Sequence, residues 1–334
     1  MAGLNIAKIR GASIKKGMLI FLGSSLLISI FLPCARLQAA EDKFLQEDET
    51  VIYKDFDPAE DDHGPGDYLY PRHEVFSPGE GLFDIKMFLI IRGKENYRFI
   101  FEFGEITDPW EGHNEFSHQL IHLYVDTGEG GQEELFRPGA GVSLAEEHPW
   151  NYHLRISGWW LRLMEPEDDP RDLIRDLEID AETSPWDVKE GEVDKKGNFI
   201  IATLPHEKIS SLPGSYFYLF VGSFDPFGED YFRDVESEPS SWSFAAPDRG
   251  DVERAPRVID WFYPREGYQE KILSDFSGAF PELTPLKIPS PEEPDPSHDE
   301  GSGEIYALFM LGIGLLIAAA IIAMITVRGR RDIG

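Results

Sequence analysis

Acidic residues crowd a stretch rich in proline and glycine that follows Phe56. They are Asp57, Glu60, Asp61, Asp62, Asp67 and, further on, Asp84. Hard cations bind several oxygens on a flexible loop, and such turns offer carboxylates together with free backbone carbonyls. We expect four of these carboxylates to hold a structural Ca²⁺ ion that fixes the stretch to the rest of the fold. The four are Asp57, Asp61, Asp62 and Asp84. The alternative is that they are ordinary solvated acids in a turn.

Tryptophan is the second residue type with a chemical use, because an exposed indole stacks on the apolar C–H face of a sugar ring. Trp110 and Trp150 each follow a proline in a loop-like context. We expect both, with Asp108 and His148 beside them in sequence, to form a sugar-facing platform. Tryptophans in strand-like segments are expected in the core. These are Trp159, Trp242 and Trp261.

His118 and His122 have the i, i+4 spacing of zinc ligands on a helix. Their segment alternates like a strand, however, and a strand holds residues at this spacing about 13 Å apart, too far for one metal. The glutamate of the HExxH pattern is also missing from this segment. The pair therefore predicts no zinc site.

The chain offers little for catalysis or for binding nucleic acid. It has no GxSxG motif, no glycine-rich phosphate loop and only one cysteine, Cys34. Among 61 acidic residues, carboxylate pairs are inevitable and do not indicate a glycosidase. A net charge of −30 disfavours contact with phosphates. We expect a binding protein, with a hydrolase as a remote alternative.

The elements that must position these residues are mostly strands. Period-two alternation and turn residues predict them over residues 86–91, 97–103, 119–125, 152–156, 159–163, 199–203, 216–222, 242–244 and 258–262. Short helices are predicted over 172–177 and 268–275. Many short strands with few helices predict an all-β, two-sheet β-sandwich.

The two ends of the chain predict a membrane protein. Residues 1–40 have the layout of a secretory signal peptide, with cleavage near Ala39 or Ala40. Residues 304–327 include a charge-free apolar run long enough to span a bilayer as one helix, and Arg328 follows it. We expect a single-pass protein of the cell membrane, with residues 41–276 outside as the folded domain. Residues 277–303 are then an acidic proline-rich stalk, and 328–334 a cytoplasmic tail.

The stretch from Asp57 to Pro71, DPAEDDHGPGDYLYP, resembles the opening motif of the glucodextranase C-terminal domain family, DOMON-like modules also found in amylopullulanases. The pattern continues in order through Phe83–Ile85, Asp108–Trp110, Phe116–Ser117, Tyr124–Asp126, Pro138–Ala140, His148–Trp150, Ser157–Trp159, Gly222–Asp225, Arg233–Val235, Trp242–Phe244 and Val258–Asp260. The sequence departs from the pattern in four places. Asp108 stands where the family usually has Asn, and Glu115 where it usually has Gly; Ala245-Ala246 replaces a glycine pair, and the stretch 166–196 is longer than is typical.

This resemblance implies a β-sandwich akin to carbohydrate-binding modules. It also leads us to expect a structural Ca²⁺ ion. Membrane-anchored members of this kind are predicted to regulate amylopullulanase. The leading hypothesis is therefore a surface module that binds α-glucan or another polysaccharide, in company with a surface amylopullulanase. One alternative is a structural adaptor that docks a cell wall, a surface layer or a neighbouring protein without free sugar. Another is a DOMON-type haem module, for which Met87 and Met164 are the main methionine candidates.

Overall fold

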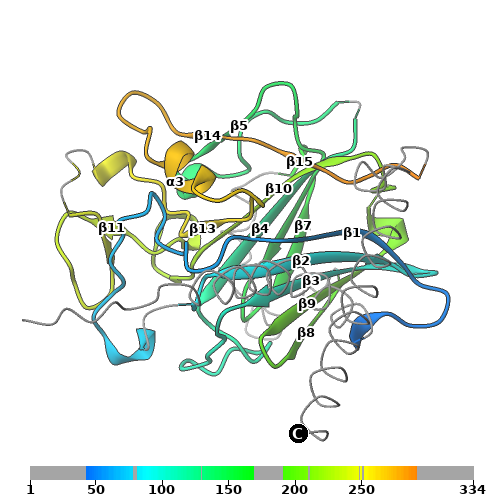
Figure 1. The fold of residues 1–334 in the computed structure, drawn as a ribbon, viewed down its shortest axis with the longest axis horizontal. Coiled ribbons are helices and arrows are strands. Elements are labelled where there is room, and N and C mark those ends of the chain that lie inside the picture. The colour runs from blue at the N-terminus through cyan, green and yellow to red at the C-terminus, as the bar shows by residue number, and fades with distance from the viewer. Residues whose placement is uncertain are drawn as a thin grey trace, which may run out of the picture.

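The computed structural model describes residues 43–291, apart from 78–80, 129, 169–190, 210, 248 and 250–251. Two antiparallel sheets lie against each other (Figure 1). The first has the order β1 (Thr50–Phe56), β2 (Ile85–Arg92), β3 (Asn96–Phe103), β9 (Phe199–Pro205) and β8 (Glu192–Lys196). The second has the order β13 (Asp260–Trp261), β10 (Tyr216–Ser223), β4 (Gln119–Asp126), β6 (Tyr152–Ile156) and β7 (Leu161–Met164). The all-β prediction is confirmed.

The main core lies between the two sheets and follows the alternation of the strands. Phe99 and Phe101 of β3 point into it from the first sheet, and Ile121, Leu123 and Val125 of β4 point into it from the second. Each of these side chains is almost fully buried. Burial of a large apolar side chain stabilises a fold by about 1.5–3 kcal/mol, so this alternation accounts for the pairing of the two sheets.

The outer face of the second sheet is also apolar, because the alternate residues of β4 include Leu120 and Tyr124. Short elements cover this face. They are η2 (Pro138–Ala140), β5 (Ser143–Leu144), η4 (Glu229–Tyr231), α3 (Tyr268–Leu273) and β14 (Glu282–Leu283). A smaller apolar cluster around Met87 lies on the outer face of the first sheet and includes Phe44.

The folded domain extends beyond residue 276, where the sequence predicts the start of a stalk. β14 pairs with β5, and β15 (Leu286–Lys287) pairs with β10. Leu283 and Ile288 are fully buried. Both residues have prolines and charged residues as sequence neighbours, so no alternating apolar pattern indicates a strand there.

The remaining elements are short. β11 (Val235–Glu236) and β12 (Phe244–Ala245) form a parallel pair, and η1 (Glu74–Phe76), η3 (His206–Lys208) and η5 (Val252–Arg254) are single 3-10 turns. No helix within the described ranges is long and apolar enough to cross a membrane. The segments predicted as signal peptide, transmembrane helix and cytoplasmic tail lie outside the described residues, as does the helix predicted over 172–177.

A long connection between β1 and β2, which we name the 57–84 loop, leaves the first sheet and runs to the β11–β12 side of the molecule (Figure 1). Backbone hydrogen bonds join Leu69 and Ala245 in both directions, at 2.8 and 3.0 Å. The amides of Arg72 and His73 donate to the carbonyls of Ser240 and Ser241. The loop therefore lies beside the segment that precedes β12.

Candidate functional site

Three tryptophans meet at a cavity of about 580 Å³, which we name the tryptophan pocket. Its lining consists of Trp110, Trp159, Phe224, Asp225, Pro226, Phe227, Arg233 and Trp242. Four loops contribute: the one after β3, the β6–β7 turn, the segment after β10 and the β11–β12 connection. Ligand pockets in proteins span roughly 300–1,000 Å³, so this one is large enough for a small molecule or a few sugar units.

Aromatic faces in the pocket are open to solvent. Trp242 is 45% exposed, Phe227 is 96% exposed, and Trp110 and Trp159 are partly exposed. Phe227 projects because Asp225 closes a tight turn beneath it, accepting a hydrogen bond from the amide of Phe227 at 3.0 Å. Exposed aromatic side chains of this kind gather at binding surfaces.

Other rings hold the tryptophans from behind. His73 stacks on Trp242, with ring centroids 4.1 Å apart. Phe76 meets both Trp110 and Trp242 edge-on, at 6.1 and 6.4 Å. His118 packs against Trp110 at 4.7 Å. The tryptophan faces are therefore set before any ligand arrives, which reduces the entropy lost on binding.

Arg233 ties the walls of the pocket together. Its guanidinium donates to the Ser223 hydroxyl at 3.1 Å and to the carbonyls of Phe224 and Trp242, each at 2.9 Å. It also pairs with the Asp225 carboxylate at 2.9 Å. Burial lowers the pKa of Arg233, while the charge of Asp225 opposes that shift. With these partners, Arg233 positions the lining of the pocket.

His118 supports the pocket as a neutral ring. Burial lowers the pKa of His118 to about 4. Its Nε2 lies 3.0 Å from the carbonyl oxygen of Val75, so this nitrogen carries the proton and donates. The ring thereby ties the 57–84 loop to the wall formed by Trp110.

A second site is acidic. One carboxylate oxygen from each of Asp57, Asp61 and Asp260 lies within 4.8 Å of the others, and we name these three residues the acid cluster. Asp57 accepts a hydrogen bond from the amide of Tyr263 at 2.8 Å, and Asp260 accepts one from Ile85 at 2.6 Å. Each of the three carboxylates also has a buried oxygen without a protein partner. Carboxylates that converge and have oxygens free for a further ligand suit Ca²⁺.

Electrostatics at the acid cluster favour a cation. Burial, followed by the neighbouring carboxylates, raises the pKa of Asp57 and of Asp260 well above its usual range. The same causes raise the pKa of Asp61 to about 7. Asp57 is 8% exposed and Asp260 is fully buried. A divalent ion would neutralise this repulsion, because charge buried without a partner is costly.

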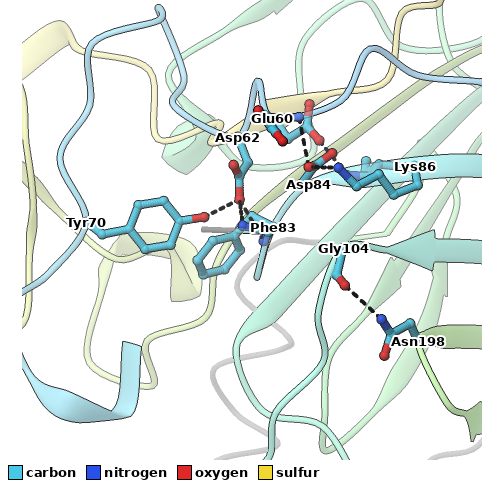
Figure 2. Close-up of polar contacts among 11 residues, drawn as sticks. Glu60, Asp62, Tyr70, Phe83, Asp84, Lys86, Gly104 and Asn198 are labelled. Atoms are coloured by element: carbon cyan, nitrogen blue, oxygen red, sulfur yellow. Dashed lines mark hydrogen bonds and ion pairs between the residues drawn. The ribbon is translucent and has the colours of Figure 1, made fainter. Parts of the chain in front are cut away.

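Asp84 and Asp62 lie near Asp61, since the charge of each raises its pKa. Figure 2 shows Asp84 with Glu60 and Lys86, and Asp62 with Tyr70 and Phe83. Asp84 accepts from the amide of Glu60 at 2.9 Å and pairs with Lys86, while its second oxygen is buried and unpartnered. The charge of Asp84 is among the causes that raise the pKa of Asp61. Burial also raises the pKa of Asp84, although Lys86 lowers it. A cavity of about 370 Å³ opens beside Asp84, and Asp62 and Lys86 also line it.

A family model for the C-terminal binding module of glucodextranase, described as SLH-like, matches residues 52–285. The chain belongs to this family. The match spans both sheets, the tryptophan pocket and the acid cluster, so the described domain is a binding module and the family is not one of catalytic domains. A comparison with curated proteins finds no match.

The binding module brings one of the four predicted sugar-contacting residues, Trp110, into the pocket. Asp108 lies nearby, where it accepts from the amide of Gly112 at 2.8 Å and shapes the loop. Trp150 is 1% exposed, and its indole donates to the carbonyl of Glu134 at 2.7 Å. The predicted pairing of Trp110 with Trp150 is therefore corrected, because Trp150 packs in the apolar layer over the second sheet.

His148, the fourth predicted residue, also lies away from the pocket. It pairs with Asp126 at 2.9 Å, and its ring lies 3.9 Å from that of Tyr216. Trp261 is buried as expected, whereas Trp159 and Trp242, also expected in the core, line the pocket. Both follow small turn residues, at 157–158 and 240–241, and precede their strands. Their position directly after a turn is the feature of the sequence that could have indicated exposure.

Of the four predicted cation ligands, the binding module brings Asp57 and Asp61 together, with Asp84 next to them. Asp62 lies outside the acid cluster, although one of its oxygens is buried without a protein partner. It accepts from the Tyr70 hydroxyl and from the amides of Gly81 and Phe83, at 3.0 and 3.3 Å for the amides, and so holds the 57–84 loop closed (Figure 2). Sequence reasoning missed Asp260, which joins the cluster from β13, far along the chain.

Proposed function

We propose that this binding module holds carbohydrate in the tryptophan pocket, and that the carbohydrate is an α-glucan. The observation that carries the proposal is the set of exposed aromatic faces around one cavity. Trp242 and Phe227 are open to solvent, and Trp110 and Trp159 add further apolar walls. Sugar rings present C–H faces to such walls and hydroxyls to the polar groups between them.

Charge supports a neutral ligand. Arg233 is the basic residue of the pocket lining, and its guanidinium is occupied by the protein's own oxygens. Asp225 adds an acid to the same lining, and the whole chain has a net charge of −30. Anionic polymers are repelled by such a surface. A neutral glucan carries no such penalty.

In the cell, we infer that the module is held at the outer surface of the membrane by the apolar segment 304–327 and serves as an accessory to amylopullulanase-type degradation. The charge-free run, the arginines after it and the N-terminal signal layout support this placement. The module itself performs no hydrolysis in this proposal. Its contribution is to keep polysaccharide close to the cell.

We also propose that the acid cluster, with Asp84, holds Ca²⁺. The support is the convergence of three carboxylates, each with a buried oxygen that lacks a protein partner. A bound Ca²⁺ supplies positive charge there and fixes the ends of the 57–84 loop. Because Asp260 belongs to β13, the bound ion also connects the loop to that strand.

A direct test titrates the full chain, purified in mild detergent with Ca²⁺ present, with maltoheptaose, cellohexaose and xylohexaose in a calorimeter. Saturable binding of maltoheptaose in preference to the other two supports the α-glucan proposal. Binding of another glycan alone corrects the ligand. Absence of binding to any glycan contradicts carbohydrate recognition and favours the adaptor function, for which the exposed Phe227 offers a protein contact.

A further inference from the structure

We propose that a cation bound at the acid cluster controls the affinity of the tryptophan pocket, and that the 57–84 loop transmits this control. The inference rests on the proposed carbohydrate function. It connects two sites through a single segment whose ends lie at one site and whose middle lies at the other. The control is reciprocal, because an ion that favours the ligand-binding state is itself bound more tightly when ligand is present.

Both ends of the loop belong to the cation site. Asp57 and Asp61 stand at its start, and Asp84 closes it. The amide of Glu60 donates to Asp84 at 2.9 Å, which joins the two ends directly (Figure 2). The next amide after Asp84, that of Ile85, donates to Asp260 at 2.6 Å. An ion held by these carboxylates therefore fixes the distance between the start and the end of the loop.

The middle of the loop forms the rear of the tryptophan pocket. His73 stacks on Trp242 with 22° between the ring planes. Phe76 packs edge-on against Trp110 and Trp242. The carbonyl of Val75 accepts from His118. Any displacement of this part of the loop therefore moves the surface against which both tryptophans rest.

Hydrogen bonds carry the same connection along the backbone. The loop is paired with the Trp242 segment at Leu69, Arg72 and His73. Asp62 holds Tyr70 to the amides of Gly81 and Phe83, which keeps the two arms of the loop together (Figure 2). The route from cation to pocket is thus a continuous set of contacts, the kind of network through which coupling travels.

Carboxylates of the cation site stand at both ends of the loop and on β13. Asp84, at the end of the loop, is near enough for its charge to be among the causes that raise the pKa of Asp57, Asp61 and Asp260. Lys86 neutralises one of these charges by pairing with Asp84. The loop has one short 3-10 turn, η1, as its helical structure in the described part. A bound ion would draw the carboxylates at the two ends together and so add a further tie to the hydrogen bonds that hold the middle of the loop.

Hydrogen exchange measured on the full chain gives a readout that does not require glycan. We expect Ca²⁺ to slow exchange at residues 69–76 and 240–245, compared with a chelator at equal ionic strength. Amides of β3 and β10 serve as the reference, because equal protection there shows that the sandwich stays folded. Unchanged exchange at both segments in a chain that binds Ca²⁺ overturns the coupling, and absence of Ca²⁺ binding overturns it as well.

Glycan titrations give the second readout. We expect maltoheptaose to bind about tenfold more tightly with Ca²⁺ than with chelator. Asp61→Asn should lower the Ca²⁺ affinity and remove most of this ratio, while Asp194→Asn, an exposed acid on β8, should leave it unchanged. Asp260→Asn repeats the test from the other wall, in case one variant fails to fold. Equal glycan affinity with and without bound Ca²⁺ contradicts the proposal.

The outcomes separate the two proposals. Ca²⁺-dependent protection of residues 240–245 without binding of any glycan supports the coupling and overturns the carbohydrate function. Glycan binding with the same affinity in Ca²⁺ and in chelator supports the carbohydrate function and overturns the coupling between the two sites. His73→Ala removes the stack on Trp242 without touching a carboxylate, and it should reduce the Ca²⁺-dependent ratio while Ca²⁺ still binds. An unchanged ratio in His73→Ala shows that the loop is not the route.

Discussion

His122 and His153 face each other across neighbouring strands, and their ring nitrogens Nδ1 and Nε2 lie 2.9 Å apart. Both rings are 1% exposed, and each has a second nitrogen that is buried without a partner. Burial lowers the pKa of both histidines well below the usual value, and the nearby charge of Arg155 lowers each further. Two neutral rings therefore share one hydrogen bond inside the apolar layer over the second sheet.

This pair predicts a loss of stability in acid. An unfolded histidine takes up a proton near pH 6.5, but these two in the folded state resist it until much lower pH. Below pH 6.5 the unfolded state binds more protons, so the free energy of unfolding falls by up to about 1.4 kcal/mol per histidine for each pH unit. Urea unfolding from pH 7 to 5, at saturating Ca²⁺, measures this slope. A His122→Phe, His153→Phe double variant should show a shallower one, and parallel slopes would contradict the assignment.

Trp242→Ala should weaken maltoheptaose binding by about 5- to 30-fold, because a lost stacking contact of an exposed aromatic is worth of order 1–2 kcal/mol. The melting temperature should change little, since the side chain is 45% exposed. Phe280→Ala is the matched control. Phe280 is 44% exposed and lies outside the pocket lining, so its removal should leave binding intact. If the two variants change maltoheptaose affinity equally, Trp242 is not part of the binding site.

Arg233→Met should abolish glycan binding and also lower stability. The substitution removes the ion-pair partner of Asp225 and the donor to two carbonyl oxygens, and because Asp225 is 23% exposed we expect a cost of about 1–3 kcal/mol. Arg233→Lys should rescue neither property fully, because one ammonium cannot serve the spread of acceptors that a planar guanidinium reaches. Thermal melts and calorimetry on both variants check this. Glycan binding and stability equal to wild type in Arg233→Lys would show that a positive charge alone is sufficient at this position.

Calcium should raise the melting temperature of the full chain. At a hundredfold excess over Kd, a ligand bound by the folded state alone stabilises it by ~2.7 kcal/mol, or roughly 5–10 °C for a domain of this size. Asp260→Asn should remove most of the effect, because Asp260 is one of three converging ligands. Scanning calorimetry in Ca²⁺, in Mg²⁺ and in chelator makes the comparison. The same melting temperature in all three excludes a structural Ca²⁺ site.

A chain ending at residue 276 should be much less stable than one ending at residue 291. The shorter chain lacks β14 and β15 and exposes the surfaces that Leu283 and Ile288 cover. Burial of each is worth about 1.5–3 kcal/mol. Soluble expression and urea unfolding of residues 43–276 and 43–291 compare them directly. Equal free energies of unfolding for the two chains would show that residues 277–291 belong to the stalk and not to the folded domain.

Local patterns in the sequence predicted the sandwich, because a strand shows its two faces in alternate residues. β6 was predicted at its observed bounds, and the faces of β4 separate as its alternation indicates. β8 was missed, since this edge strand has four charged residues and only one apolar side chain, Val193, to indicate a buried face.

The sites were harder to predict, because exposure depends on what the rest of the chain places over a residue. Trp110 and Trp150 both follow a proline, yet Trp150 is 1% exposed because it packs against Tyr124 and Phe136, whereas Trp110 stays partly exposed. Asp57 and Asp61 were found from their own turn. Asp260 enters the same cluster from β13. The segment Val258–Asp260 matches the family pattern, but nothing near it in the sequence indicates a cation ligand.

β10 determines how a mechanical load would pass through the molecule. Its first residues, Tyr216 and Phe217, pair with β15, from which the chain continues toward its C-terminal end. Its last residue, Ser223, leads directly to Phe224 and Asp225 in the pocket wall. Tension between a captured polymer and an anchored C-terminus would therefore run lengthwise along this strand. Such tension would enter β10 through only two residue pairs with β15, whereas eight pairs hold β10 to β4, so the β15 contact would shear first and the sheet would stay intact.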